Sequence, residues 1–230
     1  MMQQDQLITV TGQTGSDPQQ DVAKPLFEVR GLECVRHDVI LFQNISFSLQ
    51  SGDLYQADGE NGTGKTSLIR ILAGLIQPTA GEVLWQGKEI SRCLYEYQCE
   101  INYIGHLNGI KDALTPVENL KVVAALTGSR TNNDFSMILE RVGLAGLDDV
   151  TVSAMSAGQK RRVALARLLV TDTTLWLLDE PFTSLDPTGK TVIEQMIVDH
   201  CANGGIVIFA THQAMEIEGC TINHIHLGKK

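Results

Sequence analysis

The strongest constraint on the fold of this 230-residue chain is the glycine-rich segment Gly59–Thr66, which reads GENGTGKT. It fits the pattern G-x-x-x-x-G-K-[ST] and lies between a predicted strand, Leu54–Ala57, and a predicted helix, Lys65–Ala73. Its glycines allow successive backbone N–H groups to approach phosphate oxygens, and the helix N-terminus adds a partial positive charge. The segment therefore predicts a phosphate-binding loop, in which Lys65 reaches the β- and γ-phosphates and the Thr66 hydroxyl ligates Mg²⁺.

The composition is typical of a globular protein, with 43% hydrophobic and 20% charged residues. A formal net charge of −9 argues against nucleic acid or an anionic lipid surface as a direct partner. No apolar run approaches the roughly 18 residues that a membrane-spanning helix needs, and no secretory signal pattern opens the chain. The five cysteines form no CxxC motif, which is typical of a reduced cytosolic protein.

Segments of strand and helix character alternate along most of the chain. Residues 1–24 are polar and are predicted to be a disordered tail, which leaves one domain over residues 25–230. A β-rich region over 26–59 is followed, after a further short strand, by a largely helical insert at about 110–155. Helices at 157–170 and 188–200 then alternate with buried strands at 174–178 and 206–210, and a short strand at 222–227 ends the pattern. This order predicts a mostly parallel sheet with helices on both faces.

Two carboxylates follow the apolar run Leu175–Leu178. A buried parallel strand delivers its C-terminal end to the ligand crevice, so Asp179 and Glu180 are expected beside the phosphates. Asp179 is then predicted to hold Mg²⁺ through water, and Glu180 to orient or deprotonate the attacking water. The alternative is a solvated strand end with incidental acids, which the upstream phosphate loop makes the weaker interpretation.

The turn Ser156-Ala157-Gly158-Gln159 has the pattern of a capping box, with serine at the N-cap and glutamine three residues later. Thr115 and Glu118 form the same pattern at another predicted helix start. Helix capping alone explains both patterns physically. It does not explain why the turn Ser156–Gln159 ends 20 residues before Asp179 and is followed directly by a basic stretch.

These motifs occur in the order and spacing of ABC-transporter nucleotide-binding domains, which the chain resembles over about residues 26–228. The resemblance implies an α/β P-loop NTPase fold with a mostly parallel core sheet, an N-terminal antiparallel β part and a helical insert subdomain at about 110–155. It also implies that the chain binds and hydrolyses ATP with Mg²⁺. The ATP-binding residues that it implies are Gly59, Glu60, Asn61, Gly62, Thr63, Gly64, Lys65, Thr66 and Ser67.

The resemblance further implies that ATP is hydrolysed by two copies arranged head to tail. The signature turn Ser156–Gln159 contacts the γ-phosphate of ATP held by the second copy. The D-loop, formed by Ser184, Leu185 and Asp186, touches the opposite site across the dimer. His212 corresponds to the switch histidine that contacts the γ-phosphate and the catalytic glutamate, Glu180. Without the resemblance, His212 is a histidine after a core strand, for which a structural role is the simpler interpretation.

Three positions depart from the general ABC pattern. The signature reads Met-Ser-Ala-Gly-Gln, with alanine in place of the first glycine, and activity is expected to survive this small change. The position that commonly stacks on adenine falls at Arg36, with His37 as the alternative, and a guanidinium plane is able to stack on a base. The glutamine that usually senses the γ-phosphate and Mg²⁺ is replaced by His106.

Further strings narrow the resemblance to the ATP-binding subunits of the cytochrome c maturation system, which handle haem. They are Cys34, Val83–Gly87, Gly105-His106 with Gly109–Lys111, Leu114–Leu120 and Gly204–Gln213. This narrower resemblance implies integral membrane permease subunits as partners and a peripheral location on the cytoplasmic face of the bacterial inner membrane. Direct haem binding is not expected, because His224 and His226 share a strand face that offers no obvious pocket.

Three alternatives remain open at this stage. The chain could be the ATPase of another small ABC exporter, or a soluble ABC ATPase that acts on ribosomes or DNA. The soluble proteins usually carry two such domains or a long coiled coil, whereas this chain shows one domain, no heptad run and an acidic charge. A P-loop kinase or GTPase is the third alternative, and it leaves Ser156–Gln159 and His212 without a role.

Overall fold

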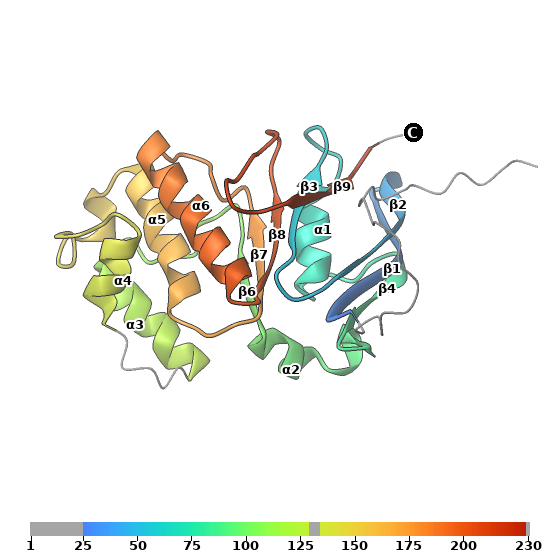
Figure 1. Ribbon diagram of the computed structural model, residues 1–230, viewed down its shortest axis with the longest axis horizontal. Helices are drawn as coiled ribbons and strands as arrows, with labels where there is room; N and C mark the ends of the chain where they lie inside the picture. Colours follow the sequence, from blue (N-terminus) through green and yellow to red (C-terminus); the bar gives the residue numbers. More distant parts are fainter. Residues whose placement is uncertain (1–24, 129–133, 229–230) are drawn as a thin grey trace, which may run out of the picture.

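A computed structural model describes residues 25–128 and 134–228, so the predicted tail at 1–24 lies outside the described residues. Two β-sheets lie side by side, with helices packed around and between them (Figure 1). One sheet has four strands in the order β2-β1-β4-β5, and the other has five in the order β6-β7-β8-β3-β9. This confirms the predicted fold class.

The four-stranded sheet is antiparallel and comes from the β-rich N-terminal region. Its strands are β1 (Phe27–Arg36), β2 (Val39–Leu49), β4 (Ala80–Trp85) and β5 (Lys88–Glu89). Residues alternate along β1 between a buried face, which includes Phe27 and Val29, and a more exposed one. β1 continues after Gly31 through irregular pairing with β2.

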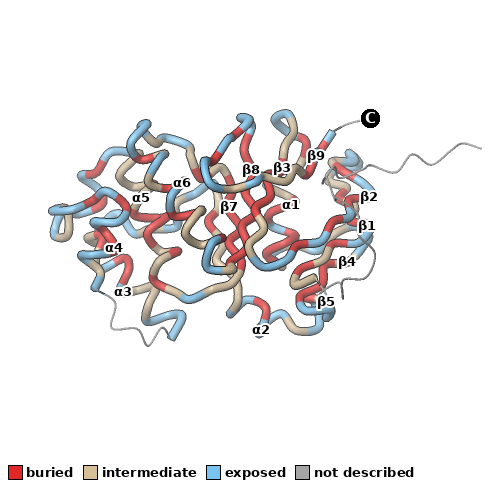
Figure 2. Tube along the Cα trace, viewed as in Figure 1, coloured by how far each residue is buried: buried red, intermediate tan, exposed pale blue. Residues whose placement is uncertain are grey.

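The five-stranded sheet is parallel at every pairing. Its strands are β3 (Leu54–Asp58), β6 (Ile101–Ile104), β7 (Leu175–Asp179), β8 (Ile206–Ala210) and β9 (Ile222–His226). All residues of β7 and β8 are buried, as expected for strands covered on both faces (Figure 2). Their C-terminal ends lie together, since Asp179 pairs in register with Ala210.

Alternate side chains of the parallel sheet enter two separate cores. Leu175 and Leu177 pack with α1 (Lys65–Leu72) and the antiparallel sheet. Trp176 and Leu178 pack on the opposite face with α5 (Ala157–Ala166) and α6 (Pro187–Ala202). The helix that follows the glycine-rich loop is thus enclosed between the two sheets, which fixes the position of the loop.

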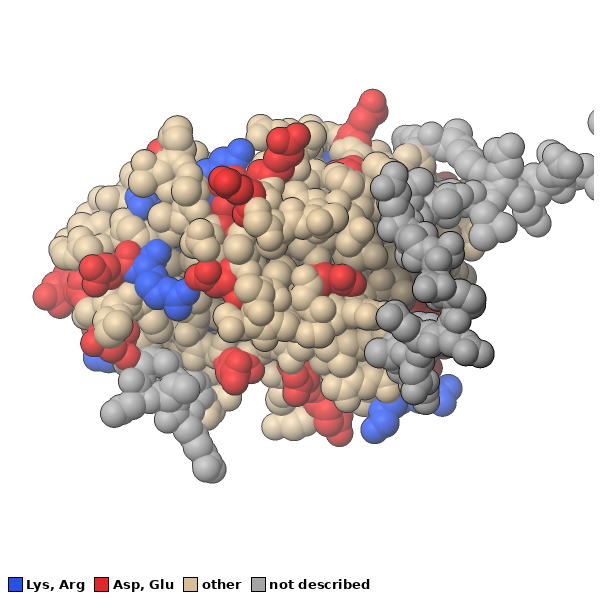
Figure 3. All heavy atoms as spheres, viewed as in Figure 1, with Lys and Arg blue, Asp and Glu red and all other residues tan. Residues whose placement is uncertain are grey.

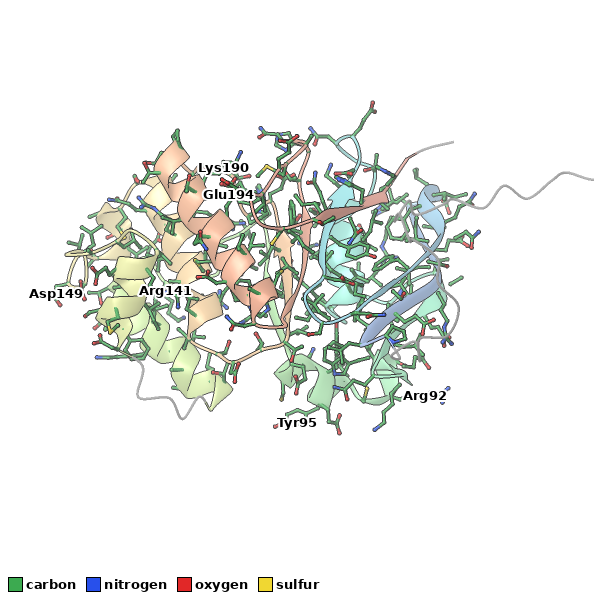
Figure 4. All side chains as sticks on the ribbon, in the orientation of Figure 1. Arg92, Tyr95, Arg141, Asp149, Lys190 and Glu194 are labelled. Atoms are coloured by element: carbon green, nitrogen blue, oxygen red, sulfur yellow. The ribbon has the colours of Figure 1, made fainter. Side chains whose placement is uncertain are left out.

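The part of the chain between β5 and β7 is largely helical. It contains α2 (Leu94–Cys99), α3 (Pro116–Thr127), α4 (Phe135–Arg141) and short 3₁₀ turns at Ile90–Arg92, Val152–Ala154 and Arg167–Leu169. Thr115 and Glu118 form the predicted capping box at the start of α3. Arg141 reaches from α4 toward α6, where its Nη2 lies 3.3 Å from a carboxylate oxygen of Asp199 (Figure 4).

Within residues 25–128 and 134–228, each helix is too short or too polar to span a bilayer. On the face shown in Figure 3, basic and acidic side chains of the described residues are interspersed, without one large basic area.

Candidate functional site

The loop Gly59–Gly64 joins β3 to α1 and closes on itself through Lys65. The ammonium group of Lys65 donates hydrogen bonds to the carbonyl oxygens of Gly59, at 2.6 Å, and Glu60, at 3.1 Å. A Cβ atom on Gly59 would lie 2.4 Å from the Leu227 carbonyl oxygen, so the tight path of the loop requires glycine there. The loop therefore presents backbone N–H groups and one buried cation at the start of a helix.

Asp179 ends β7 directly beside this loop. The Thr66 hydroxyl donates to Oδ1 of Asp179 at 3.2 Å, while Oδ2 is buried and has no hydrogen-bond partner among the described residues. Burial raises the pKa of the Asp179 carboxyl, and the nearby charge of Glu180 raises it further; the Thr66 hydrogen bond acts in the opposite direction. A buried carboxylate with one free oxygen is a suitable ligand for a cation or for its bound water.

Glu180 and His212 follow the ends of two neighbouring strands, β7 and β8. Nδ1 of His212 lies 3.2 Å from Oε1 of Glu180, so the two side chains form a pair at this edge of the sheet. Glu180 has a φ of 51°, a left-handed conformation that is unfavourable for a non-glycine residue. Such strain is held in place by surrounding contacts and is typical of functional sites.

These elements border a cavity of about 310 Å³. Asp179 and Glu180 form one side of it, and most of the rest belongs to the glycine-rich loop and the start of α1. The lining residues are Leu41, Asn61, Gly62, Gly64, Lys65, Thr66, Ser67, Asp179 and Glu180. A cavity with backbone N–H groups, one lysine and two carboxylates suits a metal-bound polyphosphate better than an apolar ligand.

The turn Ser156–Gln159 lies outside this cavity and caps α5. The Gln159 backbone N–H donates to Oγ of Ser156 at 3.2 Å, and the Ser156 backbone N–H donates to Oε1 of Gln159 at 2.9 Å, which is the predicted capping box. A Cβ atom on Gly158 would lie 2.7 Å from the Ser184 carbonyl oxygen, so this turn packs directly against the predicted D-loop. Asp186 in turn caps α6 by accepting from the Gly189 N–H at 3.0 Å.

Several predicted site residues do not line the cavity; Gly59, Glu60, Thr63 and His212 lie beside it, and Arg36 and His106 are also outside its lining. Arg36 ends β1, and its guanidinium donates to the carbonyl oxygens of Val35 at 3.2 Å and Gln77 at 3.1 Å. His106 is exposed in the loop after β6, where its charge acts to lower the pKa of Asp179. The cavity wall nearest to β1 is instead aliphatic, formed by Leu41 of β2.

The sequence interpretation gave no role to Arg161, although this buried side chain reaches the site. It lies on α5, is 3% exposed, and donates to the carbonyl oxygens of Asp179 and Glu180 at 2.9 and 2.8 Å. Burial lowers the pKa of its guanidinium, while the charges of Asp179 and Glu180 raise it. The only available signal was a basic residue on a predicted helix, which is more commonly solvated.

With this geometry in view, we compared the chain with known proteins. The ABC transporter family model matches residues 42–183, more than half of the chain. The cytochrome c biogenesis ATP-binding export protein CcmA of Nitrosomonas europaea is 44% identical over 88% of this chain and 95% of the relative. The protein of the same name from Vibrio cholerae is 44% identical over 88% of this chain and 99% of the relative. That of Mannheimia succiniciproducens is 46% identical over 83% and 89%.

Solved structures give the same result for the fold. A putative ABC transporter ATP-binding protein from Pyrococcus furiosus superposes with a TM-score of 0.76 at 25% identity, covering 87% of this chain and 96% of its own. The fold and the site thus define an ATP-binding subunit of an ABC transporter, and such proteins are ATPases. Within that class, the chain belongs to the family of the cytochrome c biogenesis ATP-binding export proteins.

Proposed function

We propose that the chain hydrolyses ATP at the cavity beside Lys65 and thereby drives the membrane part of a cytochrome c maturation transporter. The observation that carries the catalytic part is the meeting of three elements at one edge of the parallel sheet. The glycine-rich loop, the β7 end with Asp179 and Glu180, and His212 after β8 come together there through hydrogen bonds. Each element supplies a different requirement of phosphoryl transfer.

The residues beside the loop fit a magnesium ion. Mg²⁺ takes oxygen ligands and is usually bound by one or two carboxylates together with substrate phosphates. Thr66 and Asp179 already hydrogen-bond to each other, and the second Asp179 oxygen is buried with no hydrogen-bond partner in the part of the chain that the structure describes. We infer that Thr66 holds the ion directly and Asp179 through water. When bound, the ion would neutralise part of the negative charge of the phosphates.

Glu180 is proposed as the group that accepts a proton from the attacking water. Its carboxylate borders the cavity, and its pairing with His212 orients one of its oxygens. His212 and His106 are proposed to contact the γ-phosphate side of the site. Arg36 is proposed to stack on adenine, which requires its guanidinium to exchange the Gln77 carbonyl for the base.

Two copies are proposed to complete each site. Family members of this class dimerise and work with membrane permeases. Ser156 and Ala157 are exposed at a helix N-terminus, away from the cavity of their own chain. We infer that this turn binds the γ-phosphate of ATP on a second copy, where the helix dipole favours a negative charge.

The membrane partners are proposed to be permease subunits of the cytochrome c maturation complex at the cytoplasmic face of the bacterial inner membrane. Exposed apolar side chains on this chain support a protein contact near the His106 loop. Leu107 is 83% exposed, and Tyr95 on α2 is 79% exposed and points away from the body of the molecule (Figure 4). The work done there would support haem handling for c-type cytochromes.

Genetic complementation tests this function. Deletion of the encoding gene is expected to abolish covalent haem attachment to c-type cytochromes, measured by haem staining of membrane proteins. The intact chain should restore it, and a Glu180→Gln chain should not. Normal haem attachment in the deletion strain would contradict the cytochrome c assignment and favour another small ABC exporter.

Affinity purification separates the transporter from a soluble ATPase. The tagged chain is expected to co-purify with integral membrane proteins from detergent-solubilised membranes. Recovery only with ribosomes or DNA would overturn the transporter proposal in favour of a soluble ABC ATPase.

A further inference from the structure

We propose that Arg161 is the positioning residue that fixes the catalytic end of β7 and the His106 loop relative to α5. The inference rests on the proposed catalytic role of Glu180 and extends it to a residue outside the cavity. It concerns how the site is held in shape within one subunit.

The guanidinium group of Arg161 uses all of its hydrogen-bonding capacity. It makes five hydrogen bonds, and a guanidinium has five N–H donors. Nη2 and Nε donate to three successive carbonyl oxygens, those of Asp179 at 2.9 Å, Glu180 at 2.8 Å and Pro181 at 3.3 Å. Nη1 donates to the Gly105 carbonyl at 3.0 Å and to Oδ1 of Asn108 at 3.1 Å.

These acceptors are neutral, so the contacts do not form an ion pair. A buried cation without a bonded carboxylate is costly to desolvate, and burial indeed lowers the pKa of Arg161. An apolar side chain of similar volume would avoid this cost. The arrangement is better explained by what it orients, because the rigid fork of the guanidinium fixes the directions of its acceptors.

The first group that it orients is the strained backbone of Glu180. This residue combines a φ of 51° with a following proline, and residues before proline disfavour the helical regions of φ/ψ space. The Glu180 carbonyl accepts from Arg161, and the Glu180 N–H donates to the Ala210 carbonyl at 2.9 Å. Both sides of the strained peptide are thus held, and the carboxylate is directed toward the cavity.

The second group is the loop that carries His106. Gly105 and Asn108, which lie on either side of His106, both accept from Nη1 of Arg161. One side chain on α5 therefore contacts the two segments that carry His106 and Glu180. Because Ser156 caps the same helix, a movement of α5 relative to the sheet would displace Ser156 directly, and it would displace the other two segments through Arg161.

The test compares Arg161→Met and Arg161→Lys with the intact chain, in the complex recovered from detergent-solubilised membranes. We expect Arg161→Met to lower kcat for ATP about 30- to 100-fold, since a displacement of about 1 Å at a catalytic group costs about that much. The KM for ATP should change less than about threefold, because the five hydrogen bonds of Arg161 go to β7, its following residues and the His106 loop, and not to the phosphate loop. Arg161→Lys should recover part of kcat, as lysine retains three donors.

Arg162→Lys is the matched control. This neighbouring arginine is also partly buried and donates to the carbonyl oxygens of Val142 and Gly143, far from β7 in the chain. It should shift the melting temperature without changing kcat by more than about twofold. Three results would overturn the proposal. The first is a normal kcat in folded Arg161→Met, and the second is an increase in KM as large as the decrease in kcat. The third is unfolding of both Arg161 variants, which would assign the arginine to stability alone.

The two proposals fail in different ways. If Glu180→Gln keeps normal turnover, Glu180 is not the base, whatever the Arg161 variants do. If Glu180→Gln loses turnover and Arg161→Met does not, only the positioning role of Arg161 is wrong.

Discussion

The loop Gly59–Thr66 and the turn Ser156–Gln159 both open a helix, but their surroundings differ. The loop leads into α1 between the two sheets, and Thr63 and Lys65 within it are buried, whereas Glu60, Asn61 and Gly62 are exposed. The turn is exposed at Ser156, and its hydrogen bonds are satisfied within its own helix. The first, together with the end of β7, lines a cavity within one chain and forms the enclosed half of the site. The second is an exposed helix end with no acidic residue in its first turn, and we propose that it meets an anion held by a second chain.

This difference implies that ATP binding and ATP turnover respond to substitutions in different parts of this protein. Changes at the loop are expected to act on the affinity of a single chain for ATP. Changes at the turn are expected to act only when two chains close on each other. The strand end with Glu180 belongs to the enclosed half, yet we propose that it serves the chemical step, so changes there are expected to affect turnover and not ATP affinity.

The largest effect is expected from Glu180→Gln. Loss of a general base lowers kcat by roughly 10²–10⁴-fold. ATP affinity should be retained, because the lysine and the loop are unchanged, and the ATP-bound dimer should accumulate. Phosphate release and size-exclusion chromatography with ATP measure the two outcomes. Glu194→Gln, on α6 and outside the cavity lining, is the control (Figure 4). Near-normal hydrolysis by Glu180→Gln would refute the assignment.

Lys65→Ala is expected to reduce ATP affinity itself, by about 100-fold. This corresponds to the loss of roughly 2–3 kcal/mol from charged hydrogen bonds to phosphate. Binding of a fluorescent ATP analogue to the full chain measures the change. Lys190→Ala removes a half-buried lysine of α6 that does not line the cavity, and it should leave affinity unchanged. Equal affinities in the two variants would contradict the phosphate-binding role of the loop.

The exposed turn is tested by Ser156→Asp. Aspartate is an equally good N-cap, so stability should change by less than about 0.5 kcal/mol. The new negative charge would repel the γ-phosphate of ATP on the second copy, and turnover should fall about 30-fold with single-chain ATP affinity unchanged. Thr115→Asp makes the same replacement at the capped start of α3 and should have no effect on turnover. A fully active Ser156→Asp chain would show that the turn is only a cap.

Local patterns made the loop, the end of β7 and the turn at Ser156 predictable from the sequence. The loop, the buried run of β7 and the capping box at Ser156 each depend on neighbouring residues, and the structure has all three. The strand β6 and helix α2 were not predicted, because both are short and carry no strong period. Arg161 was missed for another reason: its five acceptors lie on segments distant in sequence, and only the tertiary fold brings them together.

The smallest effect concerns stability and comes from Asp179→Asn. Burial raises the folded-state pKa of Asp179 above its ordinary value, so the folded chain binds more protons than the unfolded chain in the pH range between the two values. The stability of the intact chain should therefore fall as pH rises through this range and remain lower at neutral pH. A neutral amide of the same shape removes this cost and should raise stability at pH 7 by about 1 kcal/mol, or roughly 2–4 °C in Tm.

Thermal unfolding at pH 7, with and without Mg²⁺ and ATP, measures both consequences of this replacement. Without ligands, Asp179→Asn should unfold at a higher temperature than the intact chain. With Mg²⁺ and ATP the order should reverse, because only the carboxylate can hold the hydrated ion. A variant that is destabilised in both conditions would mean that Asp179 is held in its ionised form by contacts within the chain. The charge of Asp179 would then stabilise the folded chain instead of destabilising it.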